Sequence, residues 1–145
     1  MHRSILEFSI RTAGAPSDLP DMQPRVEAAL GCRFSEGTFH NIPALVADVL
    51  GMRIGMFGWR GRDDRTVIRM DSYVGEERLL AYDGDEAPDL EYIDIGPAVV
   101  DLLEVGGAGH WYLPDAADST AELAYGEELD RAFLTDPEAM ELPED

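Results

Sequence analysis

The side chains that most often carry out nucleophilic or acid–base chemistry are few in this sequence. Its one cysteine is Cys32, and its histidines are His2, His40 and His110. Nucleophilic catalysis needs a nucleophile, a base and an orienting group within hydrogen-bond reach of one another. No triad spacing and no nucleophile-elbow motif surrounds any of these residues. We therefore expect no catalytic residue and predict that the protein is not an enzyme.

Several carboxylates between residues 83 and 94 are spaced somewhat like the ligands of a calcium-binding loop. Counted from Asp83, acidic side chains fall at positions 1, 3, 7, 9 and 12. However, position 6, where such a loop requires glycine, is Pro88, and position 12 is Asp94 instead of glutamate. The sequence also has no paired cysteines or histidines for zinc and no phosphate-loop lysine. We expect neither a metal site nor a cofactor.

Charge is distributed unevenly along the chain. Residues 1–78 contain 10 arginines and 11 acidic residues, whereas residues 79–145 contain one arginine and 19 acidic residues, so the two parts carry −1 and −18 of the net −19. A small domain needs a net charge of only about 2–8 units to stay soluble. The excess destabilises the compact state by self-repulsion, which a bound cation would relieve. We therefore expect a basic protein partner; the alternative is an acidic surface that only faces solvent.

The acidic segment that begins at Asp83 is the part of the chain where we expect a basic partner to bind. Desolvated charge pairs and aromatic anchors dominate the binding energy of many interfaces, so nearby aromatic residues are included. Core packing is the alternative role for those aromatics, and for Trp111 the two roles are equally open. The expected contact residues are Asp83, Asp85, Glu86, Asp89, Glu91, Tyr92, Asp94, Trp111 and Tyr112.

A cluster of arginines precedes the acidic half. A basic hairpin can contact nucleic acid, but nucleic-acid-binding domains are typically basic overall, and this chain is strongly acidic. We expect no direct contact with nucleic acid or with an anionic membrane. The arginines are instead expected to pair with nearby acids or with the acidic half. They are Arg53, Arg60, Arg62, Arg65 and Arg69, and the nearby acids are Asp63, Asp64 and Asp71.

The hydrophobic pattern predicts an α+β fold with a central antiparallel sheet of four to five strands. Strict alternation predicts a first strand over residues 5–11 and a hairpin of strands 52–60 and 66–74. Residues 44–50 are apolar and read equally well as a strand or a short helix. Short strands are expected at 79–82 and 110–113, an irregular segment at 34–43, and an acidic loop at 83–94. Because strands precede most helices, a parallel α/β sheet is disfavoured.

One early and two late helices are predicted from their start and stop signals. The second helix is expected to place Leu102 on its apolar side. The third is expected to open with a capping box formed by Ser119 and Glu122. The expected starts are Asp18 or Asp21, Pro97 and Ser119, and the expected ends of the first two are Gly31 and Gly106.

The length of 145 residues fits one domain spanning 1–145, with a frayed acidic tail expected at 136–145. No signal-peptide pattern and no run of about 18 apolar residues is present, so we expect a cytoplasmic protein. The sequence leaves the oligomeric state open.

In size, acidity and lack of catalytic motifs, the chain resembles small bacterial immunity proteins of polymorphic and contact-dependent toxin systems. The −18 half carries this resemblance, which is one of class, without a matching family motif. It implies a protein that neutralises a cationic toxin, such as a nuclease, by covering its active site. Two alternatives stay open: a DNA mimic that inhibits a nucleic-acid-binding protein, and an enzyme with a carboxylate-based site.

Overall fold

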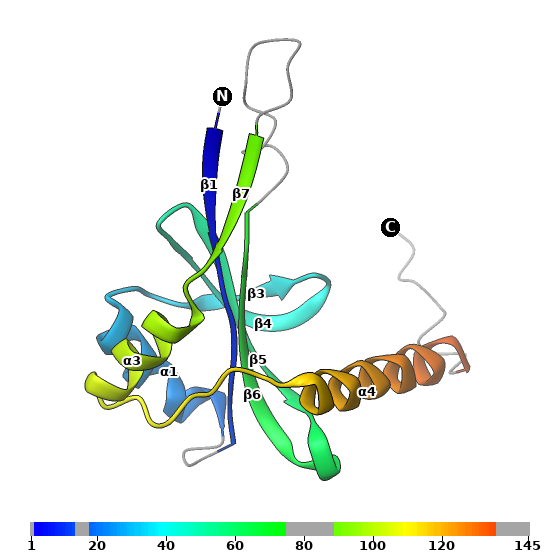
Figure 1. Cartoon of the computed structure of the whole chain (residues 1–145). Coiled ribbons are helices and arrows are strands. Elements are labelled where there is room, and N and C mark those ends of the chain that lie inside the picture. The colour runs from blue at the N-terminus through cyan, green and yellow to red at the C-terminus, as the bar shows by residue number, and fades with distance from the viewer. Residues whose placement is uncertain (1, 14–17, 75–88, 136–145) are drawn as a thin grey trace, which may run out of the picture.

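In the computed structural model of the protein, residues 2–13, 18–74 and 89–135 are described. These segments form a five-stranded antiparallel sheet, a separate parallel ribbon of two strands, and one early and two late α-helices (Figure 1). The predicted α+β fold is therefore confirmed. The parallel ribbon was not predicted. None of the described helices is long and apolar enough to cross a membrane.

The elements follow one another with short connections in the first half of the chain. The strands are β1 (His2–Glu7), β2 (Ser9–Thr12), β3 (Ser35–Phe39), β4 (Ile42–Val49), β5 (Met52–Arg60), β6 (Thr66–Tyr73) and β7 (Asp89–Asp94). The helices are α1 (Leu19–Leu30), the 3-10 turn η1 (Arg62–Asp64), α3 (Gly96–Val105) and α4 (Ala116–Thr135). The large sheet has the order β2-β6-β5-β4-β3, and β1 pairs with β7.

One face of the large sheet, which we call the inner face, is covered by α1 and α3 (Figure 1). Alternate residues of each strand point to this face, which gives the sheet its period of two. The buried contacts join apolar side chains of β5 and β6 to one side of each helix. They include Ile54, Met56, Ile68 and Met70 of the sheet, Met22 and Val26 of α1, and Val99 and Leu103 of α3.

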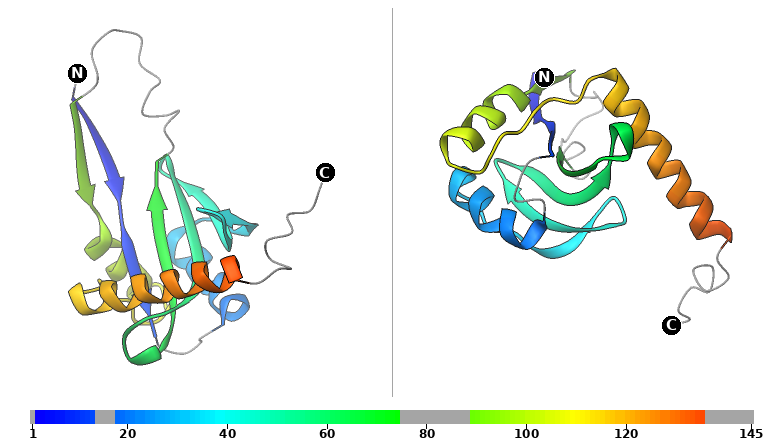
Figure 2. Two further views of the ribbon diagram at one scale, coloured as in Figure 1. Left: turned by 90° about the vertical axis from the view of Figure 1, so that its right-hand side faces the viewer. Right: turned by 90° about the horizontal axis from the view of Figure 1, so that it is seen from below.

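The opposite face, which we call the outer face, carries the remaining side chains of the same strands. Phe57 and Trp59 of β5 lie here, and so do Arg69 and Asp71 of β6 and Arg11 of β2. Helix α4 crosses one end of this face and then extends away from the body (Figure 2). The sheet is therefore apolar on one side and mixed aromatic and charged on the other.

The single strand predicted over residues 5–11 is in fact two strands. The chain first forms the ribbon strand β1 and enters the large sheet as β2 after Phe8, whose N–H donates to Ser72 Oγ at 2.8 Å. The register of that ribbon pairs Glu7 with Asp94. A contact between positions so distant in the sequence has no local signal, so alternation alone could not reveal the break.

The predictions for the middle of the chain are partly corrected. Of residues 44–50, for which strand and helix are equally open in the sequence, 44–49 belong to β4 and Leu50 lies in the turn that follows. The segment 34–43 is not irregular, because it contains β3. Its Gly37 lowers strand propensity, but a Cβ there would lie 2.9 Å from a methyl carbon of Val46, so the close pairing of β3 and β4 favours glycine. Residues 79–82 lie outside the described part of the chain.

The sequence correctly predicts both ends of the first helix, whereas its predictions for the later helices are less accurate. Asp18 caps α1 by accepting from Asp21 N–H, and Gly31 ends it with φ of 68°. Leu102 does not face the core: it is 54% exposed, and the buried positions of α3 include Val99 and Leu103. In place of a strand, residues 110–113 form an isolated bridge between Arg11 and Tyr112.

Helix α4 begins earlier than predicted. Asp115 Oδ1 accepts from the N–H of Asp118 at 2.8 Å, and Asp118 Oδ2 accepts from the N–H of Asp115 at 3.0 Å. This reciprocal pair is the capping box. Ser119 therefore lies inside the helix, and Glu122 is released for a different contact, which proves central to the outer face.

Candidate partner-binding site

Three of the expected contact residues lie exposed on β7. Glu91, Tyr92 and Asp94 all face solvent, and Tyr92 is 55% exposed. Successive strand residues point to opposite faces, so Tyr92 and Asp94 share one face of the ribbon and Glu91 lies on the other. Part of the expected acidic loop 83–94 is thus a strand. Asp83, Asp85 and Glu86 lie outside the described residues, as does the side chain of Asp89.

The two expected aromatic contacts lie elsewhere. Trp111 is 0% exposed, and its Nε1–H donates to the carbonyl of Ala108 at 3.0 Å. Of its two possible roles, the structure shows core packing, and a partner could reach this side chain only by opening the core. Tyr112 is partly buried, its backbone exchanges hydrogen bonds with Arg11, and burial raises the pKa of its phenol. Trp111 therefore belongs to the core, whereas the partner contact expected for the half-buried Tyr112 stays a prediction.

A hollow of about 580 Å³ lies on the outer side of the molecule, where the β1–β7 ribbon meets the segment that leads into α4. We call it the outer hollow. Four parts of the chain line it, and they are far apart in sequence. The strands β2 and β6 contribute Ser9, Asp71 and Ser72; the β3–β4 turn, Phe39 and His40; the segment before α4, Leu113 and Pro114; and the ends of β1 and β7, Glu7 and Asp94.

The turn between β3 and β4 presents an exposed imidazole to the outer hollow. His40 has φ of 49°, and its ring centroid lies 4.5 Å from that of Phe39 and 4.8 Å from that of Tyr73. Phe39 lies directly on the backbone of Gly55, where any Cβ would overlap its ring. The glycine therefore lets Phe39 and His40 settle against the sheet. Phe39 and His40 therefore line one side of the hollow with rings set edge to face, at 77°, and the ring of Tyr73 packs against both.

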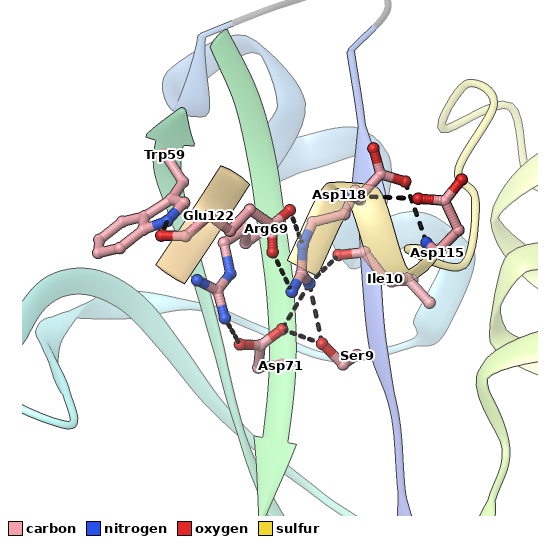
Figure 3. Close-up of polar contacts among 9 residues, drawn as sticks. Ser9, Ile10, Trp59, Arg69, Asp71, Asp115, Asp118 and Glu122 are labelled. Carbon is pink, nitrogen blue, oxygen red and sulfur yellow. Dashed lines mark hydrogen bonds and ion pairs between the residues drawn. The ribbon is translucent and has the colours of Figure 1, made fainter. Parts of the chain in front are cut away.

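Beside the hollow, a network of charged side chains joins β2, β6 and α4 (Figure 3). Arg11 donates from Nε and Nη2 to the two carboxylate oxygens of Glu122 at 2.7 and 2.8 Å. Its Nη1 donates to Asp71 Oδ1 at 2.8 Å and to Ser9 Oγ at 2.9 Å. Arg69 Nη2 donates to the other oxygen of Asp71 at 2.7 Å. We call Arg11, Arg69, Asp71 and Glu122 the buried quartet, in which Arg11 and Glu122 are buried and Arg69 and Asp71 are half-buried.

The buried quartet is electrically balanced, with two positive and two negative groups. Arg11 is 3% exposed and Glu122 is 5% exposed. Burial by itself disfavours a charged guanidinium, but the hydrogen bonds and charges of Glu122 and Asp71 outweigh it and raise the pKa of Arg11. Because its charges cancel, the quartet itself gives the neighbouring hollow little net charge.

Aromatic side chains extend the quartet across β5. The guanidinium carbon of Arg69 lies 5.1 Å from the ring centroids of both Phe57 and Trp59, which is cation–π distance. Trp59 donates from Nε1 to the carbonyl of Glu122 at 3.1 Å and meets Tyr125 edge to face. These polar and aromatic contacts hold the first half of α4 against the outer face.

The charge of the outer hollow is set by Glu7 and Asp94. Asp94 Oδ1 accepts from the N–H of Gly96 at 2.8 Å, which orients this carboxylate. Both side chains are exposed, and among the residues that the structure describes, neither forms an ion pair with arginine. With the quartet balanced, the hollow is left negative.

Further exposed acids lie on β7, α3 and α4. Within the described ranges, Arg11 pairs with Glu122 and Arg62 pairs with Asp115, but most acids of the second half form no ion pair. These unpaired and exposed acids are Asp94 of β7, Asp101 and Glu104 of α3, and Glu127, Glu128 and Asp130 of α4. The front-half arginines therefore do not neutralise the described part of the acidic half.

The candidate nucleophile gains no support from its surroundings. Burial, together with the nearby charge of Glu27, raises the pKa of the Cys32 thiol, which disfavours the reactive thiolate. His110 is exposed on the segment before α4, and the side chain of His2 lies outside the described part. Within that described part, no group of three or more histidine, cysteine or acidic residues is placed to hold a metal ion.

No protein-family model matches this chain, and neither the curated proteins nor the solved structures show a match. The site is therefore interpreted from its own geometry.

Three titratable residues that line the outer hollow are not predicted as site residues from the sequence. Glu7 and His40 lie far from the acidic segment in sequence, and Asp71 was expected only as a partner of nearby arginines. The one usable local signal was His40-Asn41 between two strand-like runs, since Asn and His tolerate positive φ in turns. The pairing of Glu7 with Asp94 has no local signal.

Proposed function

We propose that this protein binds a basic protein through the acidic and aromatic corner formed by the β1–β7 ribbon, the outer hollow and α4. The observation that carries the proposal is the uncompensated charge of this corner. Asp94 and Glu7 stand exposed beside a balanced quartet, and the exposed acids of α4 extend the negative surface on the other side.

The shape of the molecule supports a large partner. Figure 1 shows the ribbon pointing up from the sheet and α4 running away from it on the right, so that the two elements form the sides of an open angle. The outer hollow lies where they meet, between Asp94 and Pro114. A protein seated in this angle would contact the exposed Tyr92, whose ring is a suitable anchor at an interface.

Electrostatics would act mainly on the rate of association. A negative surface steers a basic protein into contact and raises the association rate constant by about 10–1000-fold over that of a neutral pair, and salt weakens the effect. The charges of the buried quartet cancel one another, so we expect the exposed acids to produce this steering.

In its narrower form, the proposal is that the basic partner is a bacterial toxin, such as a nuclease, and that binding blocks it. The class resemblance of the sequence motivates this role, and the acidic corner suits it. If it holds, the partner alone should arrest growth of a bacterial host, and co-expression of this protein should restore growth. Restored growth that persists when the corner acids are neutralised would contradict a role for the corner.

Capture from the native cell with matched variants tests the binding proposal. We compare wild type with Glu91→Gln/Asp94→Asn on the ribbon and with Asp101→Asn/Glu104→Gln on α3. Both variants lose two negative charges, and the substitution Asp94→Asn keeps a side-chain oxygen that can accept from the N–H of Gly96. Basic proteins should be retained by wild type and by the α3 variant, retained less by the ribbon variant, and released at high salt.

For a recovered partner, stopped-flow association at increasing ionic strength completes the test. The ribbon variant should associate about 3–10-fold more slowly than wild type at low salt, with a smaller difference at high salt. Recovery of acidic or neutral proteins, or equal slowing by the two variants, would contradict the proposal. Displacement of the partner by duplex DNA would identify it as a nucleic-acid-binding protein and support the DNA-mimic form.

A further inference from the structure

We infer that the outer hollow receives an arginine side chain of the basic partner. This inference rests on the proposed function and adds the chemistry of one subsite. It starts from the size of the hollow, about 580 Å³, which lies within the range of small-molecule sites and can admit one long side chain.

Most polar groups of β2 and β6 that line the hollow are already satisfied. Ser9 Oγ donates to Asp71, and Asp71 accepts from both arginines of the buried quartet. Ser72 Oγ accepts from the N–H of Phe8 and donates to its carbonyl. These groups therefore do not define the ligand. Among the described residues, the lining acceptors without a partner are the carboxylate of Glu7 and the second oxygen of Asp94.

The ligand is therefore expected to be a cation with several donors that can also lie against the exposed imidazole of His40. Guanidinium meets both conditions, because it is planar, weakly hydrated, rich in N–H donors and able to stack on rings. The ring of His40, backed by Phe39 and Tyr73, gives it a stacking surface. The apolar Leu113 lines the hollow as well, where a methylene stem can lie. An ammonium gains less from this arrangement, since it is a compact, strongly hydrated charge.

The molecule provides a model for this mode of binding close by. Arg69 lies with its guanidinium at 5.1 Å from two aromatic rings and donates to Asp71. The hollow offers the same combination of carboxylates and rings, but within the described residues no cation of the chain occupies it. A guanidinium from outside would supply the missing charge.

The probe for this subsite is N-acetyl-arginine amide, compared with the lysine amide and with the neutral citrulline amide. Amide chemical-shift changes in the full-length protein should follow the order arginine, lysine, citrulline, with a dissociation constant in the millimolar range for the arginine probe, as about −4 kcal/mol corresponds to 1 mM. The largest shifts should occur at His40, Ser72 and Gly96.

Variants separate the subsite from general charge attraction. Glu7→Gln/Asp94→Asn should weaken the arginine probe at least 5-fold, and His40→Ala should weaken it about 3-fold. The α3 pair Asp101→Asn/Glu104→Gln should leave the affinity within 2-fold of wild type. Equal shifts for arginine and citrulline probes, or shifts centred on α3, would overturn the subsite. Agmatine binding more than 100-fold tighter than the arginine amide would also overturn it, by pointing to a free amine as the ligand.

Failure of the subsite is distinguishable from failure of the proposed function. If a basic protein is captured and associates in a salt-dependent way, while Glu7→Gln/Asp94→Asn leaves its dissociation rate unchanged, the partner binds but does not insert an arginine here. If no basic protein is captured while the arginine probe still binds with the expected selectivity, the subsite is supported and the proposal of a basic protein partner is contradicted.

Discussion

The two faces of the large sheet use the same strands for different purposes. On the inner face, Ile54, Met56, Ile68 and Met70 are at most 2% exposed and pack against two helices with apolar contacts. On the outer face, the neighbouring residues of the same strands are aromatic or charged, and α4 is held through Arg11 and Glu122. The contrast shows which side holds the fold together and which side is available for a ligand.

The difference also explains how a chain with a net charge of −19 can fold around one core. Its buried charges on the outer face cancel within the quartet, so the cost of desolvation is offset by close pairing. Most other acids of the described segments are exposed, and the buried Asp118 is held in the capping box of α4. Stability is therefore expected to depend mostly on the inner face, and binding mostly on the outer corner.

The largest expected effect is on the inner side. Trp111→Ala should lower the free energy of unfolding by about 3–5 kcal/mol, because it opens a cavity in the core and removes the bond to Ala108. Urea denaturation measures the change. Trp111→Phe should lower the free energy of unfolding by clearly less. If Trp111→Ala lowered it by less than about 1 kcal/mol, the inner face would not dominate stability.

The next largest effect should come from the buried quartet. Glu122→Gln leaves Asp71 as the one carboxylate that pairs with Arg11 among the described residues and should lower the free energy of unfolding by about 2–4 kcal/mol. The exposed pair of Arg53 and Asp48 provides the control, since Asp48→Asn should cost less than about 1 kcal/mol. The double variant Arg11→Met/Glu122→Leu should recover part of the loss. Equal costs for the two single variants would contradict the special role of the quartet.

A smaller effect is expected where the aromatic side of the hollow rests on β5. Gly55→Ala should cost about 1–3 kcal/mol, because the new methyl group overlaps Phe39 and forces it to move. Gly58→Ala, on the same strand, meets no atom within 4 Å and is the matched control. Gly55→Ala should also weaken the arginine probe through displacement of His40. If Gly55→Ala left the affinity for the arginine probe unchanged, the position of the His40 ring would not matter for ligand binding.

The smallest effect concerns the start of α4 and depends on pH. The backbone N–H of Asp118 lowers the pKa of the Asp115 carboxyl below its ordinary 3.8. A carboxylate whose pKa is lowered by folding stabilises the fold above its unfolded pKa, and this contribution is lost as pH falls through the folded value. Asp115→Ala should thus lower Tm by about 2–4 °C at pH 6, and the difference should shrink as the pH falls below 3.8. A difference that grows toward acid would contradict this linkage.

Much of the inner face could be predicted from the sequence because its signals are local. Alternation located the 52–60 and 66–74 hairpin, and Asp18 and Gly31 marked the ends of the first helix. The sequence predictions were wrong where a side chain contacts a residue that is far away in the sequence. Glu122 is predicted to belong to a capping box, but it pairs with Arg11, which lies 111 residues earlier in the sequence.

The candidate site was less predictable for the same reason. The sequence predicts a contact role for Glu91, Tyr92 and Asp94, which are exposed, but it could not show that Asp94 lies beside Glu7 through parallel pairing. Trp111 could not be assigned from its type, because tryptophan suits both cores and interfaces. His40 joins the hollow only because the β3–β4 hairpin folds back onto β5.

Cross-saturation NMR on the complex with a captured basic partner tests most directly whether the outer corner is the binding surface. With this protein deuterated and its partner irradiated, amide signals of residues 91–94 and of His40 and Asn41 should lose the most intensity. Those of α3, which is also acidic, should stay at background. Losses centred on Asp101 and Glu104, or spread evenly over all exposed acids, would contradict the claim that the corner binds the partner.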